Sequence, residues 1–373
     1  MIRWFPRWWC GLLAGMLLLV MALVAFLHLP AFGASPHTEH LPADPQRADS
    51  SFRNPLPTSI LAEGHSSPSI LLHDWLNPVS GLHPPAALPA VRVNLSALDR
   101  QQDVVIWLGH ASFLVQLAGQ RMLIDPLLGD SIGPKPFGVK AFAGTRPYSL
   151  AELPPIDTLL ITHDHWDHLD YDTITALRGK VGRVLVPLGV GAHFLRWGYA
   201  ADTVQEGRWY QRVSLSPAVA AYLVPARHYS GRGLRNNGTL WAGYALVSAQ
   251  KRLLFSGDSG FGPHFREIGR QLGPFDLAAL DMGQYDARWP LIHMTPEEAA
   301  LAATQLRTRQ LLPAHVGRFS LARHRWDEPF DRIVAASSDR NYQLLTPRIG
   351  EPVDLNRPLT APPMRWWRAV SPH

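Results

Sequence analysis

The chain has 373 residues, of which 46% are apolar and 17% are charged, so there is enough apolar material for a sizeable core. The net charge of +5 is modest and the arginines are scattered. This excludes a basic arm of the kind that binds nucleic acid, while remaining compatible with anionic surfaces such as lipid headgroups. The single cysteine, Cys10, excludes disulfides and thiolate metal sites elsewhere, so any metal must be held by histidine and carboxylate.

The N-terminus combines two arginines, Arg3 and Arg7, with an uncharged apolar run over about residues 8–27. This length lies between a long signal-peptide core and a short spanning helix, and 31–33 offers a small-x-small cleavage site. We expect 1–33 to be an uncleaved anchor in the inner (cell) membrane, with the remaining chain outside or in the periplasm. A cleaved signal, with secretion to the periplasm, is the alternative; a buried core helix suits the flanking tryptophans and arginines less well.

Residues 34–90 are rich in Pro and Ser and predict a tether or an extended segment that wraps the domain. Periodic structure begins near residue 91, and we expect the folded domain to span 91–350, followed by a C-terminal tail at 351–373. The alternating patterns predict strands at 91–98, 103–109, 112–126 (a hairpin), 156–162, 181–189, 218–228, 240–249, 251–258, 276–283 and 310–317.

Helical patterns are interleaved with these strands, at 170–179, 190–198 and 295–307. The last of these helices has Thr295 as its N-cap, Pro296 at its first position and Glu298 to complete a capping box. This alternation after an initial β meander predicts an α/β fold of two sheets covered by helices.

The stretch "THDHWDHLD", from Thr162 to Asp170, follows a predicted buried strand. His163 and His165 are two residues apart, so in extended backbone their imidazoles point to the same side and can bind one cation. Asp167 and His168 can then turn to a second position. Further candidates follow other predicted strands, namely His228, Asp258 and His315. A polar surface loop would explain one such histidine, but not a cluster together with three further candidates at strand ends. We therefore expect a metal site of imidazole and carboxylate that suits zinc, iron or manganese.

These motifs resemble those of the metallo-β-lactamase superfamily, because "ARHYSGR", "FSGDSG" and "PAHVG" follow "THDHWDHLD" in the family's order. The resemblance implies an αβ/βα four-layer sandwich and two divalent ions, most consistent with Zn²⁺. By residue, it assigns one ion to His163, His165 and His228, the other to Asp167, His168 and His315, and Asp258 to the position between them.

A narrower resemblance covers about residues 52–330 and is to the N-acyl-phosphatidylethanolamine-hydrolysing phospholipase D family. It rests on "FRNPLP", "GHASFLVQL", "IDPLLGD", "YDARW", "HMTPEEA" and the long stretch around 257–299. Two departures bear on the substrate. The chain has "DMG", with the extra acid Asp281, where the family usually has Pro-Ile-Gly, and "RWPL" replaces a stretch that usually contains Met.

We hypothesise that two ions share a water molecule and lower its pKa, which gives a hydroxide that attacks phosphorus in line. Asp167 would ligate and orient this nucleophile, and His293 would hold the phosphate or protonate the leaving group. Asp125 and His110 are expected beside the ligands, Arg232 against an anionic headgroup, and Tyr285 and Arg288 along the pocket. For His293, Asp125, His110 and Arg232, an ordinary structural role such as a turn, a cap or a solvated loop stays open.

The resulting interpretation is a phosphodiesterase of phospholipase D type that acts on a membrane glycerophospholipid at the membrane surface. The alternatives are a lactonase or a cell-envelope phosphoesterase on the same scaffold, and a non-catalytic metal-binding module, which would need a disrupted ligand set. The sequence leaves open whether the chain forms a homodimer, and it gives no sign of a nucleic-acid partner.

Overall fold

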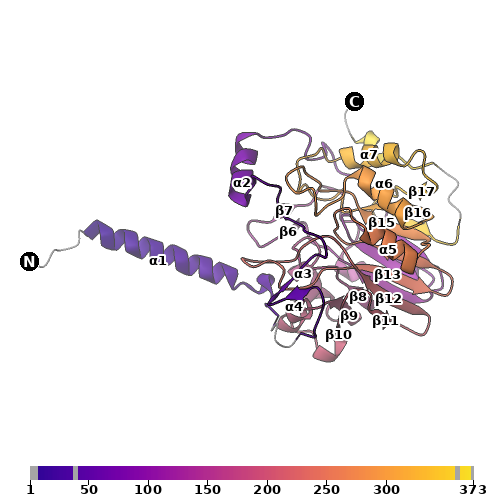
Figure 1. Ribbon diagram of the computed structural model, residues 1–373, viewed down its shortest axis with the longest axis horizontal. Helices are drawn as coiled ribbons and strands as arrows, with labels where there is room; N and C mark the ends of the chain where they lie inside the picture. The colour runs from indigo at the N-terminus through magenta and orange to yellow at the C-terminus, as the bar shows by residue number, and fades with distance from the viewer. Residues whose placement is uncertain (1–6, 37–40, 358–361, 371–373) are drawn as a thin grey trace, which may run out of the picture.

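A computed structural model describes residues 7–36, 41–357 and 362–370 (Figure 1). Within these residues, two seven-stranded mixed sheets pack face to face. The first has the order β10 (Val204–Gly207), β9 (Val181–Pro187), β8 (Ile156–Leu160), β5 (Gln120–Ile124), β4 (Phe113–Leu117), β3 (Val104–Trp107) and β18 (Pro352–Asp354). The second has the order β11 (Arg212–Ser214), β12 (Val219–Val224), β13 (Gly243–Ser248), β14 (Arg252–Phe255), β15 (Leu277–Asp281), β16 (Gln310–Ala314) and β17 (Gln343–Leu344).

Helices cover the outer face of each sheet, which gives four layers (Figure 1). The first sheet is covered by α3 (Tyr171–Leu177) and α4 (Gly191–Arg196), and the second by α5 (His264–Gln271), α6 (Pro296–Gln305) and α7 (Glu328–Ala336). The predicted αβ/βα sandwich is therefore confirmed.

Strand β3 shows why both faces of the first sheet are apolar. Val105 and Trp107 belong to the core between the sheets, whereas Val104 and Ile106 belong to the core under α3 and α4. Successive side chains of a strand point to opposite faces, so a strand that is covered on both sides reads as an uninterrupted apolar run. The parallel halves of the sheets, β5-β8-β9-β10 and β14-β15-β16-β17, bring several strand ends to one edge of the sandwich.

Small elements complete the described chain. They are the two-residue strand pairs β1 (Arg47–Ala48) with β2 (Ser51–Phe52) and β6 (Ser131–Ile132) with β7 (Val139–Lys140), and the 3₁₀ turns Pro30–Phe32, Leu95–Ala97, Leu150–Glu152, Ala201–Thr203 and Trp366–Ala369. Two helices precede the sheets, α1 (Arg7–Leu27) and α2 (Ser67–Leu76).

Helix α1 extends away from the body (Figure 1), and its described apolar side chains are exposed except for Phe26 and Leu27, which are half-buried. In the described part of the chain, no helix is long and apolar enough to cross a membrane. After α1, residues 28–36, which we call the N-terminal strap, return to the body. Trp197 Nε1 donates to Pro30 O at 2.8 Å, and Ala34 N donates to His193 Nδ1 at 3.1 Å.

Two sequence-based boundaries need correction. The strand expected at 91–98 is absent, because Asn94 accepts hydrogen bonds from Ser96 N and Ala97 N and so caps the short turn Leu95–Ala97. The tail expected at 351–373 contributes β18, which pairs with β3, so the folded domain extends beyond residue 350. Of the two roles expected for 34–90, the described part wraps the domain: Phe52 is fully buried in the main core.

Candidate metal centre

The histidine-rich loop 163–168 is anchored by the residue that precedes it. Thr162 N donates to Asp125 Oδ1 at 2.8 Å, and Thr162 Oγ1 donates to Asp125 Oδ2 at 2.6 Å. Asp125 follows β5 and Thr162 follows β8, and these neighbouring strands are parallel. The buried carboxylate therefore fixes the start of the loop relative to the sheet.

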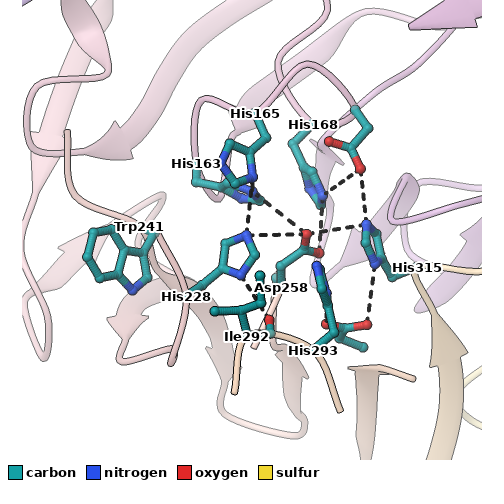
Figure 2. Close-up of polar contacts among 12 residues, drawn as sticks. His163, His165, His168, His228, Trp241, Asp258, Ile292, His293 and His315 are labelled. Atoms are coloured by element: carbon teal, nitrogen blue, oxygen red, sulfur yellow. Dashed lines mark hydrogen bonds and ion pairs between the residues drawn. The ribbon is translucent and has the colours of Figure 1, made fainter. Parts of the chain in front are cut away.

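Three imidazoles and a carboxylate form a first cluster, with one ligand atom from each within 4.8 Å of the others. His165 Nδ1 lies 2.9 Å from His163 Nε2 and 3.1 Å from His228 Nε2. Asp258 Oδ2 lies 3.8 Å from His163 Nε2 and 3.6 Å from His228 Nε2 (Figure 2). The first ligand set expected from the sequence is thus gathered in space, with Asp258 at its side.

A second cluster lies against the first and contains Asp167, His168 and His315, together with His110. Asp167 Oδ2 is 3.1 Å from His315 Nε2 and 3.7 Å from His168 Nε2. Asp258 also lies beside both imidazoles: its Oδ1 is 3.1 Å from His168 Nε2, and its Oδ2 is 3.2 Å from His315 Nε2 (Figure 2). Asp258 therefore contacts both clusters.

Outer hydrogen bonds determine which ring nitrogen faces the centre. His168 Nδ1 donates to Asp125 Oδ2 at 2.8 Å, and His228 Nδ1 donates to Ile292 O at 2.9 Å. Thr162 Oγ1 gives its proton to Asp125, so it accepts from His163 Nδ1 at 3.0 Å. When each of these rings is neutral, its Nε2 is left with a lone pair directed inward.

This donor set fits a divalent cation. In the first cluster, the Nε2 lone pairs of His163 and His228 both face His165 Nδ1, which has at most one proton to donate. In addition, the buried His165 Nε2 has no hydrogen-bond partner among the described residues. Imidazole and carboxylate at such spacing are ligands that zinc, iron and manganese accept.

The histidines of the two clusters differ in the direction of their pKa shifts. Burial lowers the pKa of His163 and of His228 well below the ordinary value, so both rings are neutral and ready to ligate. Burial also opposes charge on His315, but Asp258 and Asp281 outweigh it and raise its pKa to about 10. In the same way, Asp258 and Asp167 overcome the burial of His168 and raise its pKa well above the usual range. Because ligands must be deprotonated, loading the second cluster releases protons.

The carboxylates of the two clusters have pKa values below the ordinary range. Burial opposes ionisation of Asp258, but His168 and His315 outweigh it and hold the pKa of Asp258 well below its ordinary value. Asp167 is held low in the same way, mainly by His168 and by its hydrogen bonds to His110 and His315. Both acids are therefore ionised at neutral pH.

The two residues expected beside the ligands lie there. Asp125 accepts from the ligand candidate His168, as described above, and His110 Nε2 lies 2.9 Å from Asp167 Oδ2. His110 has a positive φ of 55°, and its backbone pairs with Val316, so the chain beyond β3 is joined to the chain beyond β16.

The structure gives Arg232, Tyr285 and Arg288 polar partners within the protein. Arg232 is buried, and its guanidinium donates to Asp164 O, Leu169 O and Ala31 O at 2.9, 2.6 and 2.8 Å. These donors join the ligand loop to the N-terminal strap, and the residue also lines the groove that opens onto the clusters.

The other two side chains face away from the site. Tyr285 Oη donates to Glu328 on α7 at 2.8 Å. Arg288 pairs with Asp286 at 2.6 Å and with Asp74 on α2 at 2.7 Å, so it connects α2 to the domain.

Two supporting residues were not assigned a role from the sequence. Asn54 Nδ2 donates to His228 O at 2.7 Å, and Asn54 Oδ1 accepts from His228 N at 3.2 Å. Asp164 accepts from Gly231 N at 2.7 Å and from Thr239 Oγ1 at 2.9 Å, which ties the 163–168 loop to the loop after His228. Asp164 stands inside the histidine-rich motif, and Asn54 stands in "FRNPLP", so both carried a local signal.

A groove of about 980 Å³ opens onto the two clusters. Its floor includes His165, Asp167, Asp258, His293 and His315. Its walls come from segments far apart in sequence and are mainly apolar, among them Phe26, Phe32, Ile60, Leu71, Phe137 and Trp289. A substrate with a polar reacting group and a long apolar part matches this division.

Comparison with known proteins agrees with this geometry. The model of the β-lactamase superfamily domain matches residues 120–316. The chain belongs to the metallo-β-lactamase superfamily. It is a metal-dependent hydrolase of that superfamily, and its His and Asp clusters are able to bind metal.

Within the superfamily, the chain is 38% identical over 328 residues to an uncharacterised protein of Mycobacterium tuberculosis, a match that covers 87% of each chain. It is 34% identical over 245 residues to N-acyl-phosphatidylethanolamine-hydrolysing phospholipase D 1 of Caenorhabditis elegans, covering 61% of this chain and 67% of that one. The structure of Igni18, a metallohydrolase from Ignicoccus hospitalis, superposes with a TM-score of 0.53 at 21% identity and covers 68% of this chain and 97% of its own. This last likeness shows the shared fold.

Proposed function

We propose that the protein hydrolyses a phosphodiester bond of a membrane glycerophospholipid, in the manner of an N-acyl-phosphatidylethanolamine phospholipase D. The observation that carries this proposal is the groove, in which apolar walls lead to a floor of imidazole and carboxylate ligands. A phosphodiester bears a charged group that suits the floor, and acyl chains suit the walls. The relative from Caenorhabditis elegans supports the same substrate class.

In this proposal, His163, His165 and His228 hold one divalent ion, and Asp167, His168 and His315 hold the other, with Asp258 shared between them. Zinc is the metal that we expect, given four-coordinate preference and ligands of this kind. When bound, the pair of ions supplies positive charge that acidifies a water molecule and neutralises the phosphoryl oxygens.

The chain's own groups orient the reaction. Asp167 lies on the groove floor, and its Oδ2 is held by His110 Nε2 at 2.9 Å, so its carboxylate is fixed in place to align the attacking water. His293 also lies on the floor, and its Nδ1 is bonded to Asp281 Oδ2 at 2.9 Å. Its Nε2 therefore remains available to hold a phosphoryl oxygen or to give a proton to the departing alkoxide.

The rim of the groove favours a lipid surface as the place of reaction. Leu71 on α2, Phe137 between β6 and β7, and Leu234 are 71%, 76% and 87% exposed, and all three line the groove. Helices α1 and α2 and the β6–β7 hairpin lie on the same side of the molecule in Figure 1. An exposed apolar rim around a groove is typical of a membrane interaction site, and the net charge of +5 favours anionic headgroups.

The test is to incubate the detergent-solubilised, zinc-loaded chain with vesicles that contain N-acyl-phosphatidylethanolamine and to identify the products by mass. We expect phosphatidic acid and the N-acylethanolamine. The Asp258→Ala and His163→Ala variants should release neither and should lose bound metal by elemental analysis, while the circular dichroism spectrum stays close to that of the wild type.

Parallel assays with a soluble lactone and with a water-soluble phosphodiester separate the alternatives. Lactone cleavage without lipid cleavage would replace the proposal by a lactonase. Cleavage of the soluble diester alone would remove the lipid and keep the phosphodiesterase chemistry. A wild-type chain that binds fewer than about one divalent ion under metal-replete expression would contradict the ligand scheme.

A further inference from the structure

Asp281 is a buried carboxylate to which the proposed mechanism gives no task of its own. It is the last residue of β15, and it pairs in register with Ala314 at the end of the parallel strand β16. His315 is the next residue, so the sheet register places the acid beside a ligand candidate. The side chain is fully buried, and its Oδ2 also accepts from Ser259 N at 3.1 Å.

The two oxygens of Asp281 face the outer nitrogens of two different imidazoles. Oδ2 is hydrogen-bonded to His293 Nδ1 at 2.9 Å, whereas Oδ1 faces His315 Nδ1 at 3.4 Å, an ion-pair contact in which neither atom has a hydrogen-bond partner among the described residues. The two rings are stacked, with centroids 5.0 Å apart and an interplanar angle of 13°. Figure 2 shows them side by side, with the ring of His293 extending towards Asp258.

We propose that Asp281 is a positioning residue that fixes His315 and His293 together, so that one carboxylate aligns a metal ligand and the catalytic imidazole. A carboxylate only accepts hydrogen bonds, so His293 directs an Nδ1–H to Asp281 and turns its Nε2 towards the groove, while a neutral His315 places its proton on the Nδ1 that faces Asp281. For His315, Nε2 then faces Asp167 and Asp258 at 3.1 and 3.2 Å. The part of this inference that concerns His293 rests on the proposed function, whereas the part that concerns metal affinity at His315 does not.

The arrangement couples two tasks that are usually supported separately. A carboxylate behind a metal-binding histidine fixes its tautomer and orientation, and losing such a partner typically weakens metal binding about 10- to 100-fold. Because Asp281 also holds His293, its loss would move the catalytic imidazole at the same time. An acid at this position therefore supports both the ion at the second cluster and the geometry of the leaving-group side.

The experiment compares Asp281→Ala, Asp281→Asn and a matched control, Ser256→Ala. Ser256 Oγ accepts from Asp281 N at 3.0 Å and donates to Gly257 O at 2.6 Å, and none of its described hydrogen bonds goes to either imidazole, so its loss reports local perturbation of the backbone around Asp281. Zinc affinity is measured by competition with a chromophoric chelator, and steady-state kinetics are measured on a water-soluble phosphodiester. Thermal unfolding verifies that each variant folds.

We expect Asp281→Ala to retain one ion tightly and to bind the second about 10- to 100-fold more weakly. Its kcat should fall at least tenfold at saturating zinc while KM is unchanged. Asp281→Asn keeps one acceptor oxygen, so it should rescue part of the affinity and part of kcat. Ser256→Ala should match the wild type in both measurements.

A double variant separates the two tasks. If Asp281 acts on turnover through His293, Asp281→Ala/His293→Ala should have the kcat of His293→Ala alone at saturating zinc, yet should still show the weakened second ion. Additive losses of kcat, or an Asp281→Ala chain that binds both ions as the wild type does, would overturn the inference. If the wild type proves inactive on diesters, the affinity comparison still decides the role at His315.

Discussion

His264 is a single residue whose burial has a consequence for the acid stability of the whole chain. It begins α5, its Nε2 lies 3.0 Å from Ser259 Oγ, and its ring packs on Phe265. Burial, with a smaller contribution from the charge of Arg227, lowers the pKa of His264 to about 3. The folded state therefore keeps this imidazole neutral over a range of pH in which an unfolded chain would protonate it.

This predicts a loss of stability with falling pH. The folded pKa lies below the unfolded value of about 6.5, so below that pH unfolding takes up a proton, and the free energy of unfolding falls by up to about 1.4 kcal/mol per pH unit until about pH 3. Urea unfolding at pH 6.5 and pH 5 should show that the wild type loses about 2 kcal/mol more than His264→Gln does. Equal losses in the two proteins would show that His264 titrates normally in the folded state.

The roles of single residues were predictable from the sequence when the residues directly followed a strong local pattern, such as an apolar strand. The seven ligand candidates each follow an apolar strand, and the structure gathers all seven. The partners of Arg232, Tyr285 and Arg288 could not be predicted, because Ala31, Glu328 and Asp74 lie in remote segments that no local pattern identifies. A charged side chain in a loop does not reveal from sequence whether it faces solvent or the backbone of another segment.

Among the elements, the N-terminal strap is held tightly for an irregular segment. Ala31 O accepts from Arg232, Trp197 donates to Pro30 O, and Phe32 packs against Trp166 with ring centroids 5.0 Å apart. Gly33 makes this path feasible: its φ of 70° and ψ of −150° are essentially restricted to glycine, and an added Cβ would lie 1.9 Å from His193 Nδ1.

We therefore predict that Gly33→Ala loosens the strap. Backbone strain alone costs about 1–3 kcal/mol, and the contact with His193 adds to it. Chymotrypsin should cleave after Phe32 faster than in the wild type, as followed by mass spectrometry. Gly64→Ala is the matched control, since Gly64 also has a positive φ of 82° but an added Cβ there has no atom within 4 Å. A strap in Gly33→Ala that resists cleavage as well as the wild type would contradict this account.

The elements predicted correctly are those whose apolar period is long or whose caps are explicit. β8 and β15 are runs of buried residues, and α6 has the capping box read from Thr295 and Glu298. α5 was missed because its eight residues bury only Phe265, Ile268 and Gly269, which is too short a pattern to recognise. β18 has three residues, and its place beside β3 depends on contacts between segments that lie about two thirds of the chain apart.

For the whole molecule, the metal centre lies where the two sheets meet. The 163–168 loop follows β8 of the first sheet, whereas His228, Asp258 and His315 follow β12, β14 and β16 of the second. Ions that bind both sets of ligands would link the two halves of the sandwich. Such ions bind the folded state alone, so they stabilise it according to their concentration relative to the dissociation constant.

Removing metal should accordingly destabilise the fold as well as stop turnover. At a free zinc concentration about 1,000 times the dissociation constant, the expected contribution is about 4 kcal/mol. Calorimetry should show a lower Tm after treatment with EDTA and recovery when zinc is restored. Asp258→Ala should show little response to either treatment. A wild-type Tm that is insensitive to EDTA, with metal removal verified by elemental analysis, would exclude a structural contribution from the ions.

The attachment of Arg232 to Ala31 limits how the chain can be shortened for biochemistry. The same guanidinium that reaches Ala31 O also holds the carbonyls of Asp164 and Leu169, which belong to the loop that carries the ligands. A truncation that starts at residue 37 to improve expression would delete one acceptor of this buried cation and uncover Trp166. A truncation that starts at His28 would remove the apolar helix and retain the contact through which Arg232 connects Ala31 to the ligand loop.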